Sequence, residues 1–269
     1  MIKLCLAPPY QQRTIFVTNC PRVENILRLK YGKYLISGSD DVDGCDKITI
    51  LKGQQDYEVS RAGGCVSTSA PLEIVNDILY EQRCFDPNIL ALHGAAVAYN
   101  GLSYLFLGAT TSGKTTLTGY LASKGFKYIT DDCILLDRET FCVYPYTTPL
   151  HFRQGGVDVL RKCGALPEKL QLLEEPSFTR YVYTPDDCIS KSLPLGRIFF
   201  LTRTEGVEDE NRVEEMTTTE RMTELLKSPI IEYSINGAYL QLIARLAKFP
   251  CHRLTYHDMN YVEEVIRNE

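Results

Sequence analysis

The sequence predicts an α/β fold with a small β-rich region before a larger core, and three observations support this prediction. Short β-branched and aromatic runs, separated by glycines, fill the chain up to about residue 67. A short apolar run, a glycine-rich turn and a helical pattern follow one another between residues 102 and 123. Residues 196–201 form a buried-strand pattern, and three amphipathic helical patterns close the chain.

Composition and charge exclude several classes of protein. The chain has 269 residues, of which 44% are hydrophobic and 23% charged, so a sizeable core is available. The net charge of −5 argues against wholesale binding of nucleic acid or of an anionic membrane. No apolar run approaches the ~18–20 residues of a membrane span, and the proline-interrupted start does not resemble a secretory signal. We therefore expect a cytoplasmic protein whose partners include neither nucleic acid nor a membrane.

The first region is predicted to be β-rich and to end in a helix. Residues 14–17, 34–37 and 47–51 are the strand candidates. Residues 71–83 have helical spacing of apolar side chains, with a proline near the first position, where a helix tolerates it. We place the boundary here, with a β-rich region over residues 1–85 and a second domain over residues 86–269.

The second domain begins with a predicted hairpin. Residues 90–98 and 104–107 read as two strands joined at Asn100-Gly101, a dipeptide typical of tight hairpin turns. Residues 127–130 and 133–136 are two further strand candidates.

Three helices are expected near the C-terminus. The first has a capping-box pattern at Thr217 and Glu220. The second covers roughly residues 238–248, with Leu240, Ile243 and Leu246/Ala247 facing inward. The third is expected to start at Asn260 and to bury apolar residues at positions 262, 265 and 266. Residues 204–211 are expected to form an exposed turn.

The glycine-rich turn carries the clearest chemical signal. The run Gly108-Ala109-Thr110-Thr111-Ser112-Gly113-Lys114-Thr115-Thr116 fits the P-loop pattern G-x-x-x-x-G-K-[ST] in full. Its glycines let backbone N–H groups approach phosphate oxygens. Lys114 supplies a charge for the β- and γ-phosphates, and the Thr115 hydroxyl can bind Mg²⁺. Because a strand precedes and a helix follows the run, we predict a nucleoside triphosphate site here rather than a chance match.

Two acidic residues and a histidine are the next candidates. Asp131-Asp132 follows a short apolar strand, where one carboxylate can hold Mg²⁺ and another can accept a proton. Adjacent residues on a strand point to opposite faces, so we expect the two side chains to diverge. His93 lies within an apolar run, where a buried core histidine is the simpler interpretation. A place near the phosphates as a donor or proton shuttle is the alternative.

The ten cysteines give no metal or disulfide framework. No two of them have C-x-x-C spacing, so we expect free, mostly buried thiols in a reducing compartment. They lie at Cys5, Cys20, Cys45, Cys65, Cys84, Cys133, Cys142, Cys163, Cys188 and Cys251.

These motifs, taken in order, resemble those of the HPr kinase/phosphorylase family, which is related to the ATP-dependent PEP carboxykinases. The matching segments are a His-Gly strand at residues 92–97, the P-loop at residues 107–116 and a lysine-glycine-aromatic helix exit leading to the acidic pair at residues 124–132. The resemblance implies a P-loop kinase core with a mixed central sheet and flanking helices.

The resemblance also implies roles for single residues. Gly108 to Thr115 would hold the triphosphate, and Thr115 and Asp131 would serve the Mg²⁺ ion. Asp132 would be the base that accepts a proton from a serine or threonine hydroxyl, assisted by His93 and Lys114. The implied reaction is transfer of the ATP γ-phosphate to a protein serine, with ATP and Mg²⁺ as cofactors.

The chain departs from the family in two places. The family's second signature is not found after residue 150, and the first ~85 residues do not resemble the usual N-terminal domain. We therefore expect a shared reaction with a different acceptor, namely a small protein or a ribosomally made peptide. A small-molecule kinase or carboxykinase-like enzyme and a nucleotide-binding switch without transfer activity are the alternatives. The sequence leaves a homo-oligomer open.

A further cation is expected to serve the transferring phosphoryl group. The candidates are Arg153, Arg161, Arg180 and Arg197, and the glycine pair after Arg153 favours that residue. Lys191 is a candidate for a loop over the substrate.

Overall fold

The chain divides into two compact units. The computed structural model describes residues 1–6, 13–36, 45–71, 73–75, 78, 86–175, 178–204, 211–230 and 235–268. One unit is Met1–Asp86 with Glu175–Ser177, and the other is Pro87–Glu174 with Phe178–Glu269. None of the helices in the described residues has the length and apolar character needed to cross a bilayer. Two predictions lie largely outside the described residues. They are the helix over residues 71–83 and the turn over residues 204–211, of which only the two end residues are described.

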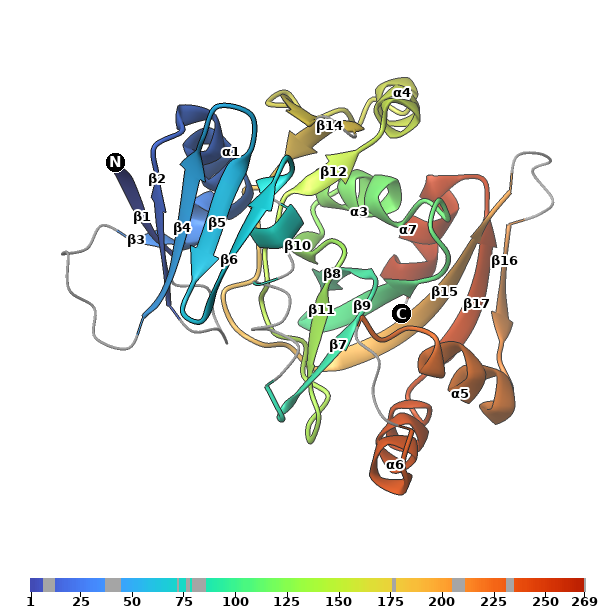
Figure 1. The fold of residues 1–269 in the computed structure, drawn as a ribbon. Coiled ribbons are helices and arrows are strands. Elements are labelled where there is room, and N and C mark those ends of the chain that lie inside the picture. The colour runs from blue at the N-terminus through green and yellow to red at the C-terminus, as the bar shows by residue number, and fades with distance from the viewer. Residues whose placement is uncertain are drawn as a thin grey trace. The chain divides into compact units, whose positions relative to one another are not determined.

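The first unit contains a six-stranded sheet with the order β3-β1-β2-β4-β5-β6 (Figure 1). The pairs in it are antiparallel except for β2 and β4, which run parallel. The predicted strands over residues 14–17 and 47–51 are confirmed as β2 and β4, and β3 covers part of the third. The elements are β1 (Ile2–Leu6), β2 (Thr14–Thr18), α1 (Pro21–Tyr31), the short 3₁₀ helix η1 (Gly32–Tyr34), β3 (Leu35–Ile36), β4 (Asp46–Lys52), β5 (Tyr57–Arg61) and β6 (Gly64–Thr68).

Helix α1 was not predicted from the sequence. It begins with Pro21 at its first position, and Val23, Ile26, Leu27 and Tyr31 are buried on one face. This spacing of three and four residues is that of an amphipathic helix. The helix connects the two parallel strands of the sheet, a connection that needs a crossover segment of this kind.

The second unit is built around a mixed six-stranded sheet with the order β10-β8-β9-β15-β17-β16. Strands β9, β15 and β17 run parallel, so their carboxyl ends meet at one edge of the sheet. The strands of this unit are β7 (Ile89–Leu92), β8 (Ala95–Tyr99), β9 (Leu102–Leu107), β10 (Lys127–Thr130), β11 (Ile134–Asp137), β12 (Leu150–Phe152), β13 (Gln171–Glu175), β14 (Phe178–Tyr183), β15 (Leu195–Arg203), β16 (Arg212–Glu215) and β17 (Cys251–Tyr256). Its helices are α3 (Lys114–Ser123), α4 (Gln154–Lys162), α5 (Thr218–Leu226), α6 (Gly237–Leu246) and α7 (Met259–Arg267).

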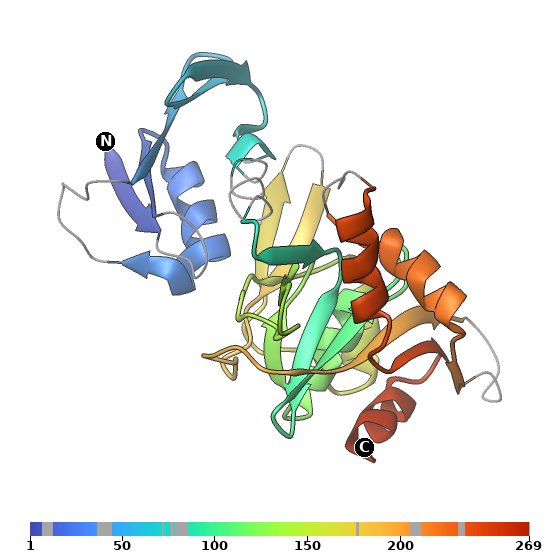
Figure 2. The same ribbon diagram turned by 90° about the horizontal axis from the view of Figure 1, so that it is seen from below.

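Helices cover both faces of this sheet. Tyr104 and Phe106 of β9 pack in a core with α3, α4 and α7. Leu105 and Leu107, the alternate residues of the same strand, pack in a second core with α5 and α6. Figure 2 shows α5 and α6 lying side by side. The short sheet β12-β14-β13 adds to the first face through the contacts of β12 with α3.

The strand predicted over residues 90–98 is wrong, because the chain forms two strands there. β7 pairs with β11, whereas β8 pairs with β9 and β10 in the central sheet. The break falls at His93 and Gly94. A Cβ atom on Gly94 would lie 2.6 Å from both the Phe106 carbonyl oxygen and Leu107 Cδ2, so only glycine fits this approach to β9. The predicted hairpin at Asn100-Gly101 is confirmed, with both residues at positive φ.

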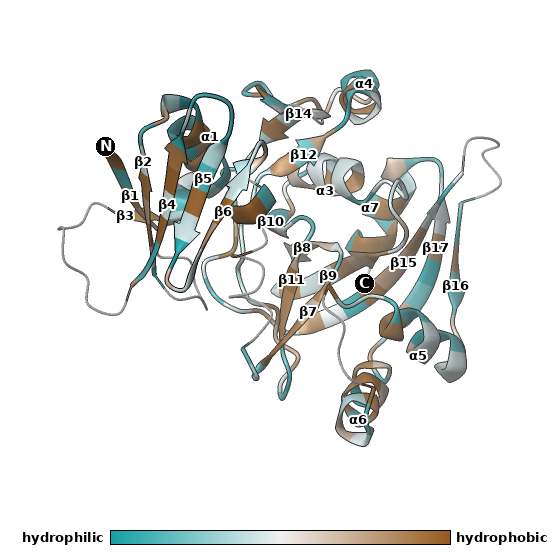
Figure 3. Cartoon of the chain, viewed as in Figure 1, coloured by the Kyte–Doolittle hydropathy of each residue, from teal (hydrophilic) through white to brown (hydrophobic). Residues whose placement is uncertain are grey.

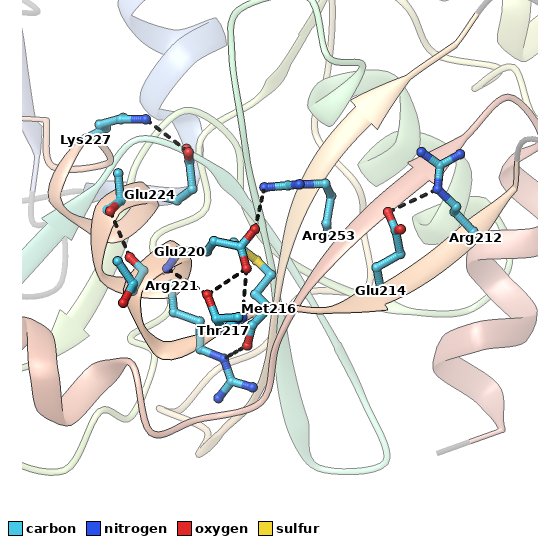
Figure 4. A network of polar contacts seen from close by, with 11 residues as sticks. Arg212, Glu214, Met216, Thr217, Glu220, Arg221, Glu224, Lys227 and Arg253 are labelled. Carbon is cyan, nitrogen blue, oxygen red and sulfur yellow. Dashed lines mark hydrogen bonds and ion pairs between the residues drawn. The ribbon is translucent and has the colours of Figure 1, made fainter.

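The three helices predicted near the C-terminus are all present, but their first residues and buried side chains differ in part from the prediction. Helix α5 has the predicted capping box between Thr217 and Glu220, which belongs to the network of polar contacts in Figure 4. Helix α6 buries Tyr239 and Leu242, whereas Leu240 is 38% exposed and was wrongly expected to face inward. Helix α7 begins before Asn260, because the Asp258 side chain accepts a hydrogen bond from the Asn260 N–H and caps the helix one residue before Met259.

The outer strand and the cysteines complete the description. β16 is hydrophilic along most of its length in Figure 3, in keeping with its place at the sheet edge, where charged side chains discourage further pairing. The nine cysteines among the described residues are free, as predicted. Of these nine, only Cys20, Cys133 and Cys251 are buried, so the expectation of mostly buried thiols is wrong.

Candidate functional site

The 108–115 loop connects the carboxyl end of β9 to the first turn of α3. Gly108 and Gly113 both have positive φ, at 140° and 90°, which disfavours any other residue. A Cβ atom on Gly108 would lie 2.9 Å from the Leu201 carbonyl oxygen, and one on Gly113 would lie 2.5 Å from the Tyr256 hydroxyl. The neighbouring strands β15 and β17 therefore hold the loop closely at both glycines.

Lys114 is bound to the loop that precedes it. Its Nζ atom donates hydrogen bonds to the carbonyl oxygens of Gly108 at 2.8 Å and Ala109 at 3.0 Å. The residue is only 7% exposed, and this burial lowers the pKa of its ammonium group. The negative charges of Asp131 and Asp132 oppose that shift in the pKa. The lysine side chain is thus held against the backbone carbonyl groups of the loop.

Thr115 and Asp131 form a polar pair beside the loop. The Thr115 hydroxyl donates a hydrogen bond of 3.2 Å to Asp131 Oδ1. Asp131 is 2% exposed, and its Oδ2 atom is buried without a hydrogen-bond partner in the described part of the chain. Burial, and next the charge of Asp132, raise the pKa of Asp131 well above its ordinary value, against the hydrogen bond from Thr115. A buried carboxylate oxygen without a partner is a strong acceptor for a cation.

The pair fits a Mg²⁺ ion. This ion prefers hydroxyl, carboxylate, water and phosphate oxygens, and proteins often supply only one or two of its ligands. No group of three or more histidine, cysteine or acidic side chains with metal-site geometry occurs in the described residues. A site made by Thr115 and Asp131 would therefore need phosphate and water oxygens to complete the shell.

Asp132 differs from Asp131 in its exposure to solvent. Asp131 is buried and Asp132 is exposed, so the two side chains diverge, as predicted. Asp132 has a φ of 69°, a left-handed conformation that aspartate tolerates better than most residues. The turn directs an accessible carboxylate toward the cavity described below.

His93 is an exposed residue at the break between β7 and β8. Its Nδ1 atom lies 3.2 Å from the Asp132 carbonyl oxygen, and its backbone N–H donates to the Ser228 carbonyl at 2.7 Å. The interpretation of His93 as a buried core residue is therefore wrong. The histidine lies beside the backbone of Asp132, and β7 ends one residue before it.

A cavity of about 470 Å³ brings these side chains together. Both His93 and Asp132 line it, together with Lys114 and Thr115. Of the remaining loop residues, Thr110, Thr111, Gly113 and Thr116 line it, whereas Gly108, Ala109 and Ser112 do not. The rest of the lining is basic or uncharged and consists of His151, Phe152, Arg153, Gly155, Gly156, Arg180 and Arg203. The excess of basic groups makes the cavity suited to a polyanion.

The arginine candidates divide into two groups. Arg153 and Arg180 line the cavity, whereas Arg161 and Arg197 are not among its lining residues. Arg161 instead makes an exposed ion pair with Asp158 at 3.0 Å, and the guanidinium of Arg197 lies 5.8 Å from the Phe199 ring centre.

Two further basic residues, Lys191 and Arg203, line different cavities. Lys191 lines a second cavity of about 460 Å³ beside the Asn100-Gly101 hairpin and is not among the residues that line the first cavity, so its place over the substrate stays a prediction. Arg203 was not identified from the sequence. It is the last residue of β15, and its Cδ atom would lie 3.4 Å from a Cβ atom on Gly113. The feature that could have identified Arg203 is its position at the carboxyl end of a strand that runs parallel to β9.

Comparisons with known proteins find likenesses among solved structures only. No family model matches the chain, and no curated protein matches its sequence. Among solved structures, the chain is similar to the Hpr(Ser) kinase/phosphatase from Coxiella burnetii, with 13% sequence identity and a TM-score of 0.35. The match covers 66% of this chain and 88% of that one. The chemistry of the site is therefore inferred from its own residues.

Proposed function

We propose that this protein is a kinase that transfers the γ-phosphate of Mg-ATP to a serine or threonine hydroxyl of a small protein or a ribosomally made peptide. The observation that carries the proposal is that Lys114, Thr115 and the exposed Asp132 line one basic cavity, with the buried Asp131 hydrogen-bonded behind Thr115. A phosphate cradle, a place for a divalent ion and a carboxylate that can accept a proton are the parts that phosphoryl transfer requires.

The loop and its lysine bind the donor. The 108–115 loop packs against β15 at Gly108 and against β17 at Gly113, and these contacts support its backbone N–H groups. They would cradle the α- and β-phosphates, with Lys114 at the β- and γ-phosphates. Thr115 and Asp131 would hold Mg²⁺, which neutralises part of the charge on the phosphates when bound.

Asp132 is the proposed base. Its carboxylate takes the proton from the acceptor hydroxyl as the oxygen bonds to the γ-phosphorus, and the bond from that phosphorus to the β–γ bridging oxygen breaks. The products are the phosphorylated hydroxyl and ADP. His93 and Arg203 both line the same cavity and would stabilise negative charge on the group in transfer.

A small-molecule acceptor is the second candidate. The observation that favours it is the presence of three arginines around the cavity, since such a number suits an acceptor with anionic groups of its own. A nucleotide-binding switch without transfer activity is disfavoured by the exposed Asp132, which such a module would not need.

The test is phosphate transfer measured by mass spectrometry with ATP, Mg²⁺ and panels of peptide and metabolite acceptors. Lys114→Ala should weaken ATP binding, measured by calorimetry, by about a hundredfold or more, because it removes a buried charge-assisted contact to two phosphates. Lys124→Ala, just beyond the other end of α3, is the matched control and should bind ATP normally. Unchanged ATP affinity in Lys114→Ala would overturn the proposed donor site.

A further inference from the structure

Two arginines lie next to the last pair of the β12–β14 ladder and line the cavity. The antiparallel register of β12 and β14 pairs Phe152 with Tyr181. The next residue along on each side is Arg153 and Arg180, and both line the cavity. Like charges at facing positions of neighbouring strands repel each other. An anion between the two guanidinium groups turns that repulsion into two attractive contacts.

The first turn of α4 adds to the positive potential at this place. The helix begins at Gln154, directly after Arg153, and has no acidic residue in its first turn. Gly155 and Gly156 line the cavity, so no side chain beyond Cα separates this helix end from it. The N-terminus of a helix carries a partial positive charge, which here lies beside the two arginines.

This cluster lies against a defined part of the donor site. A Cβ atom on Gly156 would be 2.8 Å from Thr116 Oγ1, so the first turns of α4 and α3 are in contact. Thr115, the preceding residue, makes its hydrogen bond to Asp131. Successive residues of a helix project about 100° apart around its axis. The paired arginines and the carboxylates therefore flank the start of α3 from different sides.

The geometry of phosphoryl transfer indicates which phosphate of the donor lies beside Arg153 and Arg180. The attacking oxygen and the leaving oxygen lie on opposite sides of the γ-phosphorus. A hydroxyl that gives its proton to Asp132 arrives from the side of the carboxylates, so the rest of the donor extends away from them. The end of the donor farthest from Asp132 then lies toward Thr116 and α4.

From this placement we infer that Arg153, Arg180 and the first turn of α4 bind the α-phosphate of the donor. The protein then binds a nucleoside triphosphate more tightly than inorganic pyrophosphate, which has no third phosphate to reach the arginines. The inference rests on the proposed kinase function and adds the class of donor to it. It also assigns two of the three arginines that line the cavity to the donor. Fewer basic side chains then remain to bind an anionic small-molecule acceptor.

The test measures binding of ATP, tripolyphosphate and pyrophosphate by calorimetry, each in the presence of Mg²⁺, to the full chain. Arg153→Gln and Arg180→Gln should each weaken ATP and tripolyphosphate by about tenfold or more, the usual effect of losing a charge-assisted contact. Pyrophosphate, bound by the loop alone, should change by less than about twofold. Arg161→Gln on the same helix is the matched control, since its side chain pairs with Asp158 outside the cavity lining.

Three results would overturn the inference. The first is a loss of affinity for pyrophosphate equal to the loss for ATP, and the second is an unchanged affinity for ATP. The third is an effect confined to the KM of the acceptor in the transfer assay, because this result would place the arginines at the acceptor. Circular dichroism of each variant shows that the fold is retained. A wild-type protein that binds none of the three ligands would refute the proposed function itself, and that result differs from each of these.

Discussion

The hydroxyl group of Tyr256 donates a hydrogen bond of 3.2 Å to the carbonyl oxygen of Ser112 and so joins the end of β17 to the 108–115 loop. Tyr256 is almost fully buried, and this burial raises the pKa of its phenol, so the group remains a donor at neutral pH. The same hydroxyl occupies the space where a side chain on Gly113 would begin. The Tyr256 hydroxyl group therefore links the position of the 108–115 loop to the position of β17.

Tyr256→Phe should loosen this coupling. Loss of the hydrogen bond leaves a buried carbonyl without its partner, which should lower the free energy of unfolding by about 1–2 kcal/mol. ATP affinity should fall as well, because the loop becomes less fixed. Chemical denaturation and calorimetry measure the two effects. Tyr261→Phe, on helix α7, is the control, and equal effects from both variants would contradict the assignment.

Asp132→Asn tests the base. Asparagine tolerates the left-handed backbone at φ 69° and keeps the shape of the side chain, so folding and ATP binding should be unchanged. The rate of phosphate transfer should fall by about 10²–10⁴, the range expected for losing a general base. Single-turnover kinetics at saturating ATP measure this rate. A variant as fast as the wild type would show that another group accepts the proton.

Gly94→Ala tests the break between β7 and β8. The added methyl group would lie 2.6 Å from the Phe106 carbonyl oxygen and from Leu107 Cδ2, so β8 must shift away from β9. We expect a loss of about 1–3 kcal/mol in thermal denaturation, together with slower transfer because His93 moves. Gly237→Ala, where a Cβ atom meets nothing within 4 Å, should be close to neutral. Similar losses at the two glycines would remove the steric explanation.

Asp137 should give the fold a measurable dependence on acid. Hydrogen bonds from the Thr140 N–H, the Tyr144 hydroxyl and the Thr140 hydroxyl lower the pKa of Asp137 to about 2. A carboxyl with a lowered pKa stabilises the fold above its unfolded-state pKa of about 4, and the stabilisation is lost as the pH falls toward 2.

Asp137→Asn should therefore unfold more easily than the wild type near neutral pH, by on the order of 1 kcal/mol after allowance for partial exposure. The difference between the two proteins should shrink as the pH is lowered through the range from about 4 to 2. Urea denaturation at a series of pH values measures it. A difference that grows on acidification would have the wrong sign and would refute the assignment.

Thr217→Ala should weaken helix α5 without touching the site. Thr217 Oγ1 accepts a hydrogen bond from the Glu220 N–H at 3.3 Å, and Glu220 Oε2 accepts one from the Thr217 N–H at 2.8 Å (Figure 4). Removing the cap should cost about 1 kcal/mol of stability. ATP affinity should stay the same, since α5 does not line the cavity. Thr219→Ala, inside the same helix, is the control and should be nearly neutral.

Local signals were sufficient to predict the parts of the fold that depend on few residues. The Asn100-Gly101 turn, the strand and helix around the 108–115 loop and the capping box at Thr217 are each determined by neighbours in the sequence. The break at Gly94 could not be predicted, since the apolar run is continuous and the cause is the close approach of β9. Position in a run of hydrophobic residues does not reveal which strand each half will pair with.

The candidate site was predicted in its contiguous part, and Arg153 and Arg180 were named as candidates without any indication of how they meet. Lys114, Thr115 and the acidic pair follow from motif spacing, whereas Arg203 does not. It reaches the cavity because β15 lies parallel to β9, a pairing between segments about ninety residues apart. Arg153 and Arg180 lie next to the last pair of the β12–β14 ladder, and no sequence pattern indicated that these segments pair.

The support of the 108–115 loop by β15 and β17 has a consequence for synthesis of the protein. Gly108 packs against Leu201, and Ser112 accepts its hydrogen bond from Tyr256, 144 residues later in the chain. When the 108–115 loop and α3 have just emerged from the ribosome during translation, the nascent chain still lacks both supports. The motif is translated early, but the pocket can assemble only after the last strand has emerged.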